Sequence, residues 1–411
     1  MNNRFDPQRR LVVRAALTAG AALPFASLAF AATAAAGTSA ADKRFVMVIL
    51  RGGLDGLSAV PALGDPAFAA ARGPLAEFAL PTLPLDAGFA LHPNLAQLHA
   101  LYGRGELAVV QAVGLPYHER SHFDAQQVLE SGGSRPYELS TGWLGRALGH
   151  KHSKGLALNT TVPLVLRGPG TVDTWSPSTL PDPSADLVTR LERMYASDAA
   201  LGTALARARS LHFDPALMAD MNSAGNGTGT STDGKLPRGG SFAVLARRAA
   251  EFLAQPNGPQ AAVLELGGWD THANQANPNG PLANNLRQLD AGLAALREGL
   301  LPGGVWQRTV VVVVSEFGRE VAVNGTQGTD HGTGGAAVVL GGAVQGGRLI
   351  ADWPGLAKKD RFEGRDVRIT TDIRAVLKGL LSDHLQVAGR SLNGDVFPGS
   401  EGVKGLSLLR A

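Results

Sequence analysis

The chain contains no cysteine among its 411 residues. This absence excludes disulfide bonds, thiolate nucleophiles and iron–sulfur ligation. The sequence also lacks the Gly-x-Ser-x-Gly motif of serine esterases. The glycine-rich stretch 225–240 has neither the spacing of a phosphate-binding loop nor a strand before it. Any chemistry in this chain must therefore come from other residue types.

Charge is also sparse, since charged residues make up 18% of the chain and hydrophobic residues 44%. This balance is typical of a folded protein rather than a disordered one. The first 41 residues hold four arginines and one aspartate, which accounts for the whole net charge of +3. The remaining chain is close to neutral, and we expect no nucleic-acid partner.

Residues 1–41 combine the pair Arg9–Arg10 with a weakly apolar, alanine-rich stretch and small residues. This pattern predicts a twin-arginine signal peptide that is cleaved between about Ala31 and Ala41. The alternative is an N-terminal membrane helix, but alanine favours insertion only weakly. We therefore expect a periplasmic protein that the twin-arginine translocation machinery exports, with no stable membrane span in its mature form.

Short apolar runs predict strands at 43–50, 106–113, 161–166, 261–266, 309–314 and 336–342. The run 310–314 consists of five valines without alternation, which is typical of a strand covered on both faces in a parallel sheet. Between the runs lie amphipathic helices, among them 282–296 with leucines at helical spacing, and 372–385. Alternating strands and helices indicate a doubly wound α/β fold.

One region departs from this alternation. Residues from about 176 to 257 contain helical stretches without a convincing strand, and residues 225–240 are rich in glycine. We interpret the region as a helical insertion with a flexible loop. The mature chain, 42–411, is then a single α/β domain.

Acidic, histidine and arginine side chains follow or precede four of the predicted strands. They are Asp55, Asp270, His272, Glu316, Arg319, Asp330 and His331. Ligands bind at the carboxyl ends of parallel strands, so we expect these residues to meet at one edge. Crowded carboxylates need a cation, and mixed imidazole and carboxylate ligands suit zinc, manganese or a similar divalent ion. The alternative is that each acid merely forms a turn or a cap.

Eight segments resemble the bacterial family known as domain of unknown function 1501. They are RGGLDGLS, RSHFDAQ, TGWLGR, GGWDTHANQ, SEFGRE, NGTQGTDHGTGG, WPGL and TTDIRAVL. The resemblance covers about 44–400, and members of this family are exported by the twin-arginine route and are called sulfatase-like. The family is grouped with the alkaline phosphatase/sulfatase superfamily. This implies a parallel-sheet, three-layer α/β/α sandwich of alkaline phosphatase-like type and a metal site that hydrolyses phosphate or sulfate esters.

The resemblance also implies metal-ligand roles for individual residues. Asp55 matches the first metal-binding aspartate of the superfamily, and Asp270 with His272 matches an Asp-His pair at a shortened spacing. His331 resembles the final metal-binding histidine. Glu316 lies in the strand-end segment that supplies further ligands.

One expected ligand is missing, because Phe317 stands where the superfamily has a histidine. His122 or Asp330 is the candidate replacement. The number of ions, one or two, therefore stays open.

Superfamily members attack their substrates with a serine, threonine or modified cysteine at a helix N-terminus, where the dipole holds an anion. Ser121 begins a predicted helix, and Arg120 or Arg319 is the candidate cation for an anionic oxygen. The alternative is that Ser121 only caps the helix. Ser58 is a lesser candidate for the nucleophile.

These features predict an exported metal-dependent hydrolase that acts on a small-molecule or polymer ester. The alternative is a catalytically degenerate metal-binding envelope protein with a binding or assembly role, which Phe317 and the uncertain nucleophile favour. The other histidines lack a ligand-like context, and we interpret them as structural or exposed: His92, His99, His118, His150, His152, His212 and His384.

Overall fold

The computed structural model describes residues 42–177, 183–212 and 242–410. The expected signal peptide, 1–41, and the glycine-rich loop at 225–240 lie outside them.

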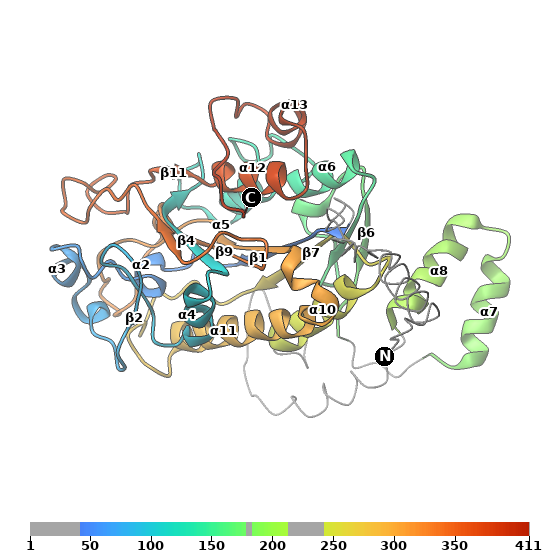
Figure 1. Ribbon diagram of the computed structural model, residues 1–411, viewed down its shortest axis with the longest axis horizontal. Coiled ribbons are helices and arrows are strands. Elements are labelled where there is room, and N and C mark those ends of the chain that lie inside the picture. The colour runs from blue at the N-terminus through green and yellow to red at the C-terminus, as the bar shows by residue number, and fades with distance from the viewer. Residues whose placement is uncertain (1–41, 178–182, 213–241, 411) are drawn as a thin grey trace, which may run out of the picture. The chain divides into compact units, whose positions relative to one another are not determined.

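A nine-stranded mixed sheet forms the centre of the fold (Figure 1). Its strands are β1 (Arg44–Leu50), β4 (Leu107–Gly114), β5 (Lys154–Ala157), β6 (Thr171–Thr174), β7 (Ala261–Leu266), β8 (Thr309–Ser315), β9 (Gly335–Leu340), β10 (Arg348–Ile350) and β11 (Thr371–Asp372). They follow the order β10-β4-β9-β8-β1-β7-β5-β6, and β11 pairs with β4. The predicted α/β class is confirmed, and the sheet is mostly parallel.

The exception is β9, which runs antiparallel to both neighbours, β4 and β8. The sheet is thus mixed rather than wholly parallel as expected. The orientation of β9 has a consequence for the site. Residues that precede β9 lie at the same edge as the residues that follow β1, β4, β7 and β8.

Helices cover both faces of the sheet (Figure 1). On one face lie α4 (Ala96–Gly103), α10 (Phe242–Ala254) and α11 (Pro281–Leu300), and on the other lie α5 (His122–Ser131), α6 (Trp143–His150) and α12 (Ile373–Asp383). Strand β1 contributes Val46 and Val48 to the first hydrophobic layer, and Phe45 and Met47 to the second. Successive side chains point to opposite faces, so a strand between two helical layers is apolar throughout.

The remaining elements are short. They are α2 (Gly56–Ala59), α3 (Phe68–Arg72), α13 (Gly389–Ser391) and the hairpin of β2 (Leu83–Pro84) and β3 (Ala90–Leu91). Four tight 3-10 turns, η2 (Gly73–Ala76), η3 (Leu164–Leu166), η4 (Pro302–Gly304) and η5 (Trp306–Arg308), and one wider π-helical turn, η6 (Leu392–Val396), complete the set. The strand predicted at 161–166 is wrong, because this run follows Pro163 into the turn η3. Val165 and Leu166 are nevertheless fully buried, which explains their apolar character.

Among the described residues of the region predicted as a helical insertion, the helices are α7 (Ala185–Tyr195), α8 (Ala199–His212) and α10. Helix α10 belongs to the core layer, since Phe242 and Leu253 are buried against the sheet side of the fold. Gly292 of α11 permits this packing, because a Cβ there would lie 2.2 Å from the Phe242 ring. By contrast, α7 buries none of its residues.

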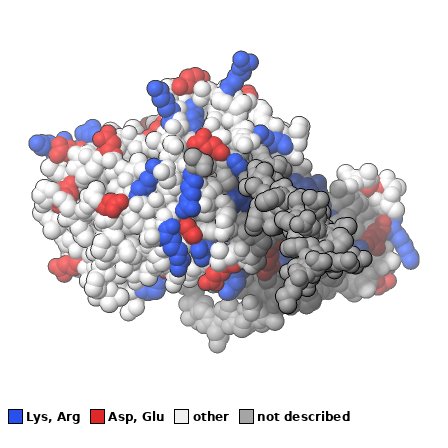
Figure 2. All heavy atoms as spheres, in the orientation of Figure 1, with Lys and Arg blue, Asp and Glu red and all other residues white. Residues whose placement is uncertain are grey.

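Within the described ranges, no helix combines the length and the apolar character needed to cross a membrane. Figure 2 shows basic and acidic side chains interspersed with neutral ones on the visible face. Charges of both signs are therefore mixed on that face.

Candidate metal centre

The histidine and acidic residues of the candidate site come from four segments at one edge of the sheet. His122 is the first residue of α5, after β4, and Asp270 and His272 follow β7. Glu316 follows β8 directly, and His331 precedes β9. Because β9 is antiparallel, the residues before it reach the edge at which the parallel strands end.

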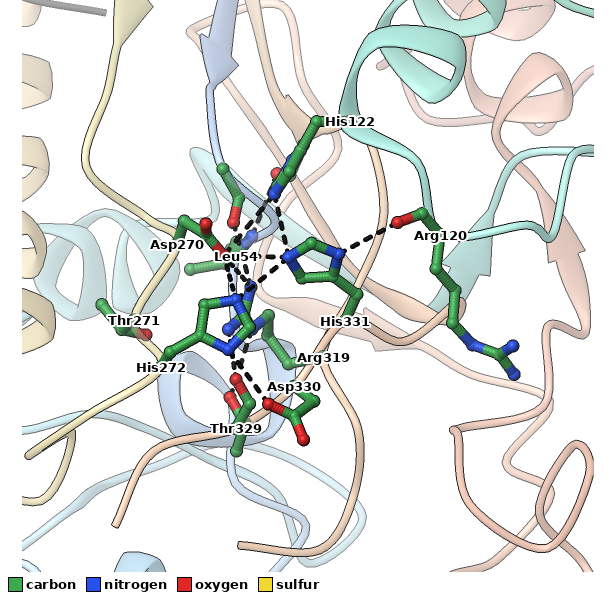
Figure 3. Close-up of polar contacts among 12 residues, drawn as sticks. Leu54, Arg120, His122, Asp270, Thr271, His272, Arg319, Thr329, Asp330 and His331 are labelled. Carbon is green, nitrogen blue, oxygen red and sulfur yellow. Dashed lines mark hydrogen bonds and ion pairs between the residues drawn. The ribbon is translucent and has the colours of Figure 1, made fainter. Parts of the chain in front are cut away.

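Three ligand-type atoms converge at this edge: His122 Nε2, His331 Nε2 and Asp270 Oδ1 (Figure 3). The two nitrogens are 3.0 Å apart, and Asp270 Oδ1 lies 3.1 Å from His331 Nε2 and 3.5 Å from His122 Nε2. A tetrahedral ion with ligand bonds of about 2.1 Å separates its ligand atoms by about 3.4 Å. The three atoms therefore have nearly the spacing that one ion requires.

His272 flanks this group. Its Nε2 lies 3.1 Å from His331 Nε2 and 2.9 Å from Asp270 Oδ1. The imidazole is 44% exposed, so it forms the solvent side of the cluster.

The opposite nitrogen of each imidazole faces an oxygen. The partners are Glu316 Oε1 for His122 at 2.8 Å, Asp330 Oδ1 for His272 at 3.0 Å and the carbonyl oxygen of Arg120 for His331 at 3.0 Å. An ionised carboxylate or a carbonyl only accepts hydrogen bonds, so each Nδ1 carries the hydrogen in the neutral ring. Each Nε2 then directs a lone pair into the cluster. Such paired outer oxygens are the usual support of metal-binding histidines, and the donor set fits a divalent cation.

A proton is the alternative cation at this position. Burial disfavours the imidazolium form of His122, but hydrogen bonds with Asp270 and Glu316 outweigh burial and raise its pKa to about 9. Burial also acts against ionisation of Asp270, yet its hydrogen bonds with His122, His331 and Arg319 hold the pKa of this carboxyl well below its usual range. The cluster therefore combines an ionised carboxylate with an imidazole at which a proton would compete with any bound metal ion.

Arg319 supports Asp270 from beneath. Its guanidinium is buried and donates to Asp270 Oδ1 at 2.6 Å. Thr329 fixes the same guanidinium, through its hydroxyl at 3.2 Å from Nε and through its carbonyl oxygen. Arg319, which the sequence suggested as a cation for an anionic substrate oxygen, therefore pairs with Asp270, a candidate metal ligand.

Glu316 lies behind His122 rather than at the convergent atoms. It is fully buried and accepts hydrogen bonds from the Gly52 backbone at 2.8 Å and from Gln126 at 3.2 Å. Burial raises the pKa of Glu316, but its hydrogen bonds with His122 and these donors lower it below the usual value. Because Gly52 and Gln126 hold the Glu316 carboxylate in place, its hydrogen bond to Nδ1 orients the imidazole ring of His122.

Phe317, at the position where a histidine was expected, packs against the cluster. Its ring centroid lies 4.7 Å from that of His122 and 5.1 Å from that of His331. Phe317 therefore forms an apolar wall beside the two imidazoles and offers no ligand atom.

Asp55 lies in a different polar cluster, and the structure does not place it in the convergent group. It caps α2 through the Leu57 and Ser58 amides and accepts from the Ser58 hydroxyl at 2.9 Å. It also accepts from Arg72 and Gln275. Burial raises the pKa of Asp55, but the charge and hydrogen bond of Arg72, together with the hydrogen bonds from Ser58 and Gln275, lower it below its usual value. The Arg72 guanidinium balances the charge of this buried carboxylate, and the four neutral donors complete its hydrogen bonds.

The side chains of Arg120 and Ser121, predicted to bind an anion and to act as the nucleophile, have different surroundings. Arg120 turns its guanidinium away from the cluster (Figure 3), towards Asp366 Oδ2 at 2.8 Å and Glu363 Oε2 at 2.5 Å. Ser121 occupies the N-cap position of α5 but makes no side-chain capping bond. Ser121 remains beside His122 in the chain.

Sequence reasoning named His122 only as a replacement ligand and did not name Arg72, Gln275 or Asp366. A signal for His122 existed, because it follows the apolar run 106–113 by fewer than ten residues. The other three act through contacts between segments distant in the sequence, which leave no local pattern.

A family model described as "Protein of unknown function (DUF1501)" matches residues 102–396. No curated protein matches the chain.

Several solved structures are similar in fold. Ps i-CgsB in complex with k-i-k-neocarrahexaose is 11% identical with a TM-score of 0.42, and the match covers 88% of this chain and 77% of that chain. A 2-O GAG sulfatase is 13% identical with a TM-score of 0.40, over 89% and 73% of the two chains. A protein in the alkaline phosphatase superfamily from Vibrio parahaemolyticus is 12% identical with a TM-score of 0.36, over 73% and 60%.

Proposed function

The chain belongs to the DUF1501 family, and we propose that it is an exported metal-dependent hydrolase of phosphate or sulfate esters. Its substrate would be a small-molecule or polymer ester. The observation that supports this proposal is the convergence of His122 Nε2, His331 Nε2 and Asp270 Oδ1 within 3.5 Å of one another. All three imidazoles of the cluster have their outer nitrogens occupied by oxygen acceptors.

In this proposal His122, Asp270 and His331 hold one divalent ion, zinc or manganese. Three protein ligands leave a coordination position open for a substrate, as in catalytic sites. An ion bound there would supply Lewis-acid chemistry, which polarises a phosphoryl or sulfuryl oxygen. We propose one ion rather than two, because Arg72 already neutralises Asp55 and Phe317 offers no ligand atom.

The chain's own residues supply orientation and an anion-binding end. Glu316, Asp330 and the Arg120 carbonyl fix the rings of the three histidines. Helix α5 begins at the cluster, so its free amide groups and its dipole attract an anionic ester to the same place. Ser121 directly precedes His122 and makes no capping bond, and we propose its hydroxyl as the nucleophile.

A second candidate function is metal binding without turnover, in an envelope protein with a binding or assembly role. The position of His272 favours it, because Nε2 lies 2.9 Å from Asp270 Oδ1 and 3.1 Å from His331 Nε2. As a fourth ligand, His272 would close a tetrahedral site, which is typical of structural metal ions.

Purified mature protein loaded with zinc or manganese and given aryl phosphate, phosphodiester and aryl sulfate substrates distinguishes the two functions. We expect turnover of at least one substrate, and Ser121→Ala should lower it by orders of magnitude with unchanged metal content. Turnover that survives Ser121→Ala would make water the nucleophile. Full metal loading without turnover would leave the second candidate function.

Export is tested separately, because it rests on residues 1–41. Replacing Arg9 and Arg10 by lysine should leave the full-length precursor in the cytoplasm, since the arginine pair is the recognised feature of the signal. Cell fractionation measures the result, and unprocessed precursor is expected. Normal processing of the doubly substituted chain would contradict the export proposal.

A further inference from the structure

His331 is held by the backbone of a residue in an uncommon conformation. Arg120 has a φ of +56°, and its carbonyl oxygen lies 3.0 Å from His331 Nδ1. Positive φ is unfavourable for residues with a Cβ and persists only where surrounding contacts impose it. The direction of this carbonyl therefore depends on what holds Arg120.

The contacts that hold Arg120 come from one segment, residues 362–367. Asp366 is fully buried and accepts from Arg120 Nε at 2.8 Å, while Glu363 accepts from Nη2 at 2.5 Å. The Phe362 ring lies 5.9 Å from the guanidinium carbon. Two carboxylates and a ring thus fix the side chain on the far side of the residue from His331 (Figure 3).

The same segment reaches His331 by a second route. Arg365 donates to the carbonyl oxygen of His331 at 3.0 Å and to Glu320 at 2.6 Å. Arg365 also contacts Asp366 at 3.1 Å, so the two routes are joined. Residues 362–367 therefore constrain both the ring and the backbone of a candidate ligand without contributing a ligand atom.

We propose that residues 362–367 are a positioning element of the metal centre, which acts on His331 through Arg120 and Arg365. This inference rests on the proposed metal site and assigns a role to a segment that no ligand pattern marks. Asp366 fixes the guanidinium, the guanidinium fixes the backbone of Arg120, and the backbone carbonyl fixes the His331 ring. Outer partners of metal-binding histidines set ligand geometry and hence affinity.

Three variants distinguish the effect of anchoring the Arg120 side chain from the effect of the Arg120 backbone conformation. Asp366→Asn removes the buried charge that holds Arg120. Arg120→Gly permits the positive φ but removes the guanidinium, so the carbonyl loses its anchor without gaining strain. Glu363→Gln compares the exposed carboxylate with the buried one, because Glu363 contacts the same guanidinium but is 56% exposed and should hold it more weakly than Asp366 does.

Zinc affinity of the mature protein, measured against a chelator, and the visible spectrum of the cobalt(II) form are the readouts. We expect Asp366→Asn and Arg120→Gly to weaken zinc binding by about 10- to 100-fold and to alter the cobalt spectrum. Glu363→Gln should change both only slightly. A change in melting temperature alone, with wild-type affinity and spectrum, would assign the segment a structural role and overturn the proposal.

The outcomes also separate this inference from the proposed function. A wild-type protein that binds neither zinc nor manganese overturns both. A wild-type protein that binds zinc, with both Asp366→Asn and Arg120→Gly at wild-type affinity, overturns only the positioning role.

Discussion

Asp55 and Asp270 both follow a buried parallel strand at the same edge of the sheet, yet their surroundings differ. Five donors surround Asp55, and one of them is the guanidinium of Arg72. Asp270 also has an arginine partner, Arg319, but three imidazole nitrogens of the histidine cluster lie around the same carboxylate. The Asp55 cluster contains its own cation and enough donors. The histidine cluster has more acceptors than donors when its rings are neutral.

The difference shows that an acidic residue at a strand end can be part of a structural ion pair or a candidate metal ligand. A buried carboxylate must be paired, and an arginine from a nearby helix is sufficient. Where three imidazoles lie around the carboxylate, as at Asp270, we propose that an external cation completes the charge balance. The surroundings of each aspartate, and not its position after a strand, therefore decide between a structural pair and a metal site.

The largest expected effect comes from removing two of the convergent atoms. Asp270→Ala combined with His331→Ala should abolish metal binding, because one candidate ligand then remains of the three that converge. Elemental analysis of the protein after expression in metal-rich medium measures the loss. The matched variant in the other cluster, Asp55→Asn, should keep its metal. Equal metal content in the double variant and the wild type would refute the assignment of the site.

Much of the fold was predictable because burial leaves a direct trace in the sequence. The run 261–266 coincides with β7, and the valine run lies within β8. The direction of β9 was not predictable, because an apolar run reads the same in a parallel and an antiparallel strand. The run at 161–166 was misassigned, since its apolar residues are buried in a turn and not in a strand.

The site was predictable in part for a similar reason. Asp270, His272 and His331 were recognised from their positions beside strands, and the structure brings them together. The pairing of Asp55 with Arg72 was not visible, because Arg72 ends the separate helix α3 and its direction depends on tertiary packing. Residues 362–367 left no signal, because they act on the site through another residue.

A smaller but still large effect is expected from Arg72→Met, which leaves Asp55 buried without its cation. Breaking a buried ion pair by removing one partner costs about 3–5 kcal/mol. Urea unfolding at neutral pH should show this loss in the free energy of unfolding. Metal content should stay at the wild-type level, because the convergent atoms are in the other cluster.

The double variant Asp55→Asn/Arg72→Met is the control for this measurement. Removing the charge of both partners should recover part of the lost stability, because no unpaired charge then remains buried. A cost of less than about 1 kcal/mol for Arg72→Met would be the value of an exposed pair and would contradict the comparison.

The last expected effect is a pH dependence of stability. It distinguishes the histidine cluster from the Asp55 cluster without a substitution in the Asp55–Arg72 pair. The pKa of His122 is raised to about 9 from an ordinary value of 6.5, so the protonated ring stabilises the metal-free protein. This contribution is fully present below pH 6.5 and is lost as the pH rises through about 9. The pKa of Asp55 is lowered, so its contribution is lost only in acid, below its ordinary value of 3.8. Between pH 6.5 and 9 only the histidine cluster should therefore respond.

Metal binding should show the opposite trend in that window. A metal ion displaces the proton of His122, so zinc affinity should rise by up to about tenfold per pH unit from 6.5 towards 9. Urea unfolding of the metal-free protein and chelator competition for zinc, each at four pH values, measure the two slopes. His122→Gln is the control, because it should remove the pH dependence of metal-free stability that this ring causes. A metal-free stability slope that persists in His122→Gln would show that another group titrates there and would remove His122 from the cluster's charge balance.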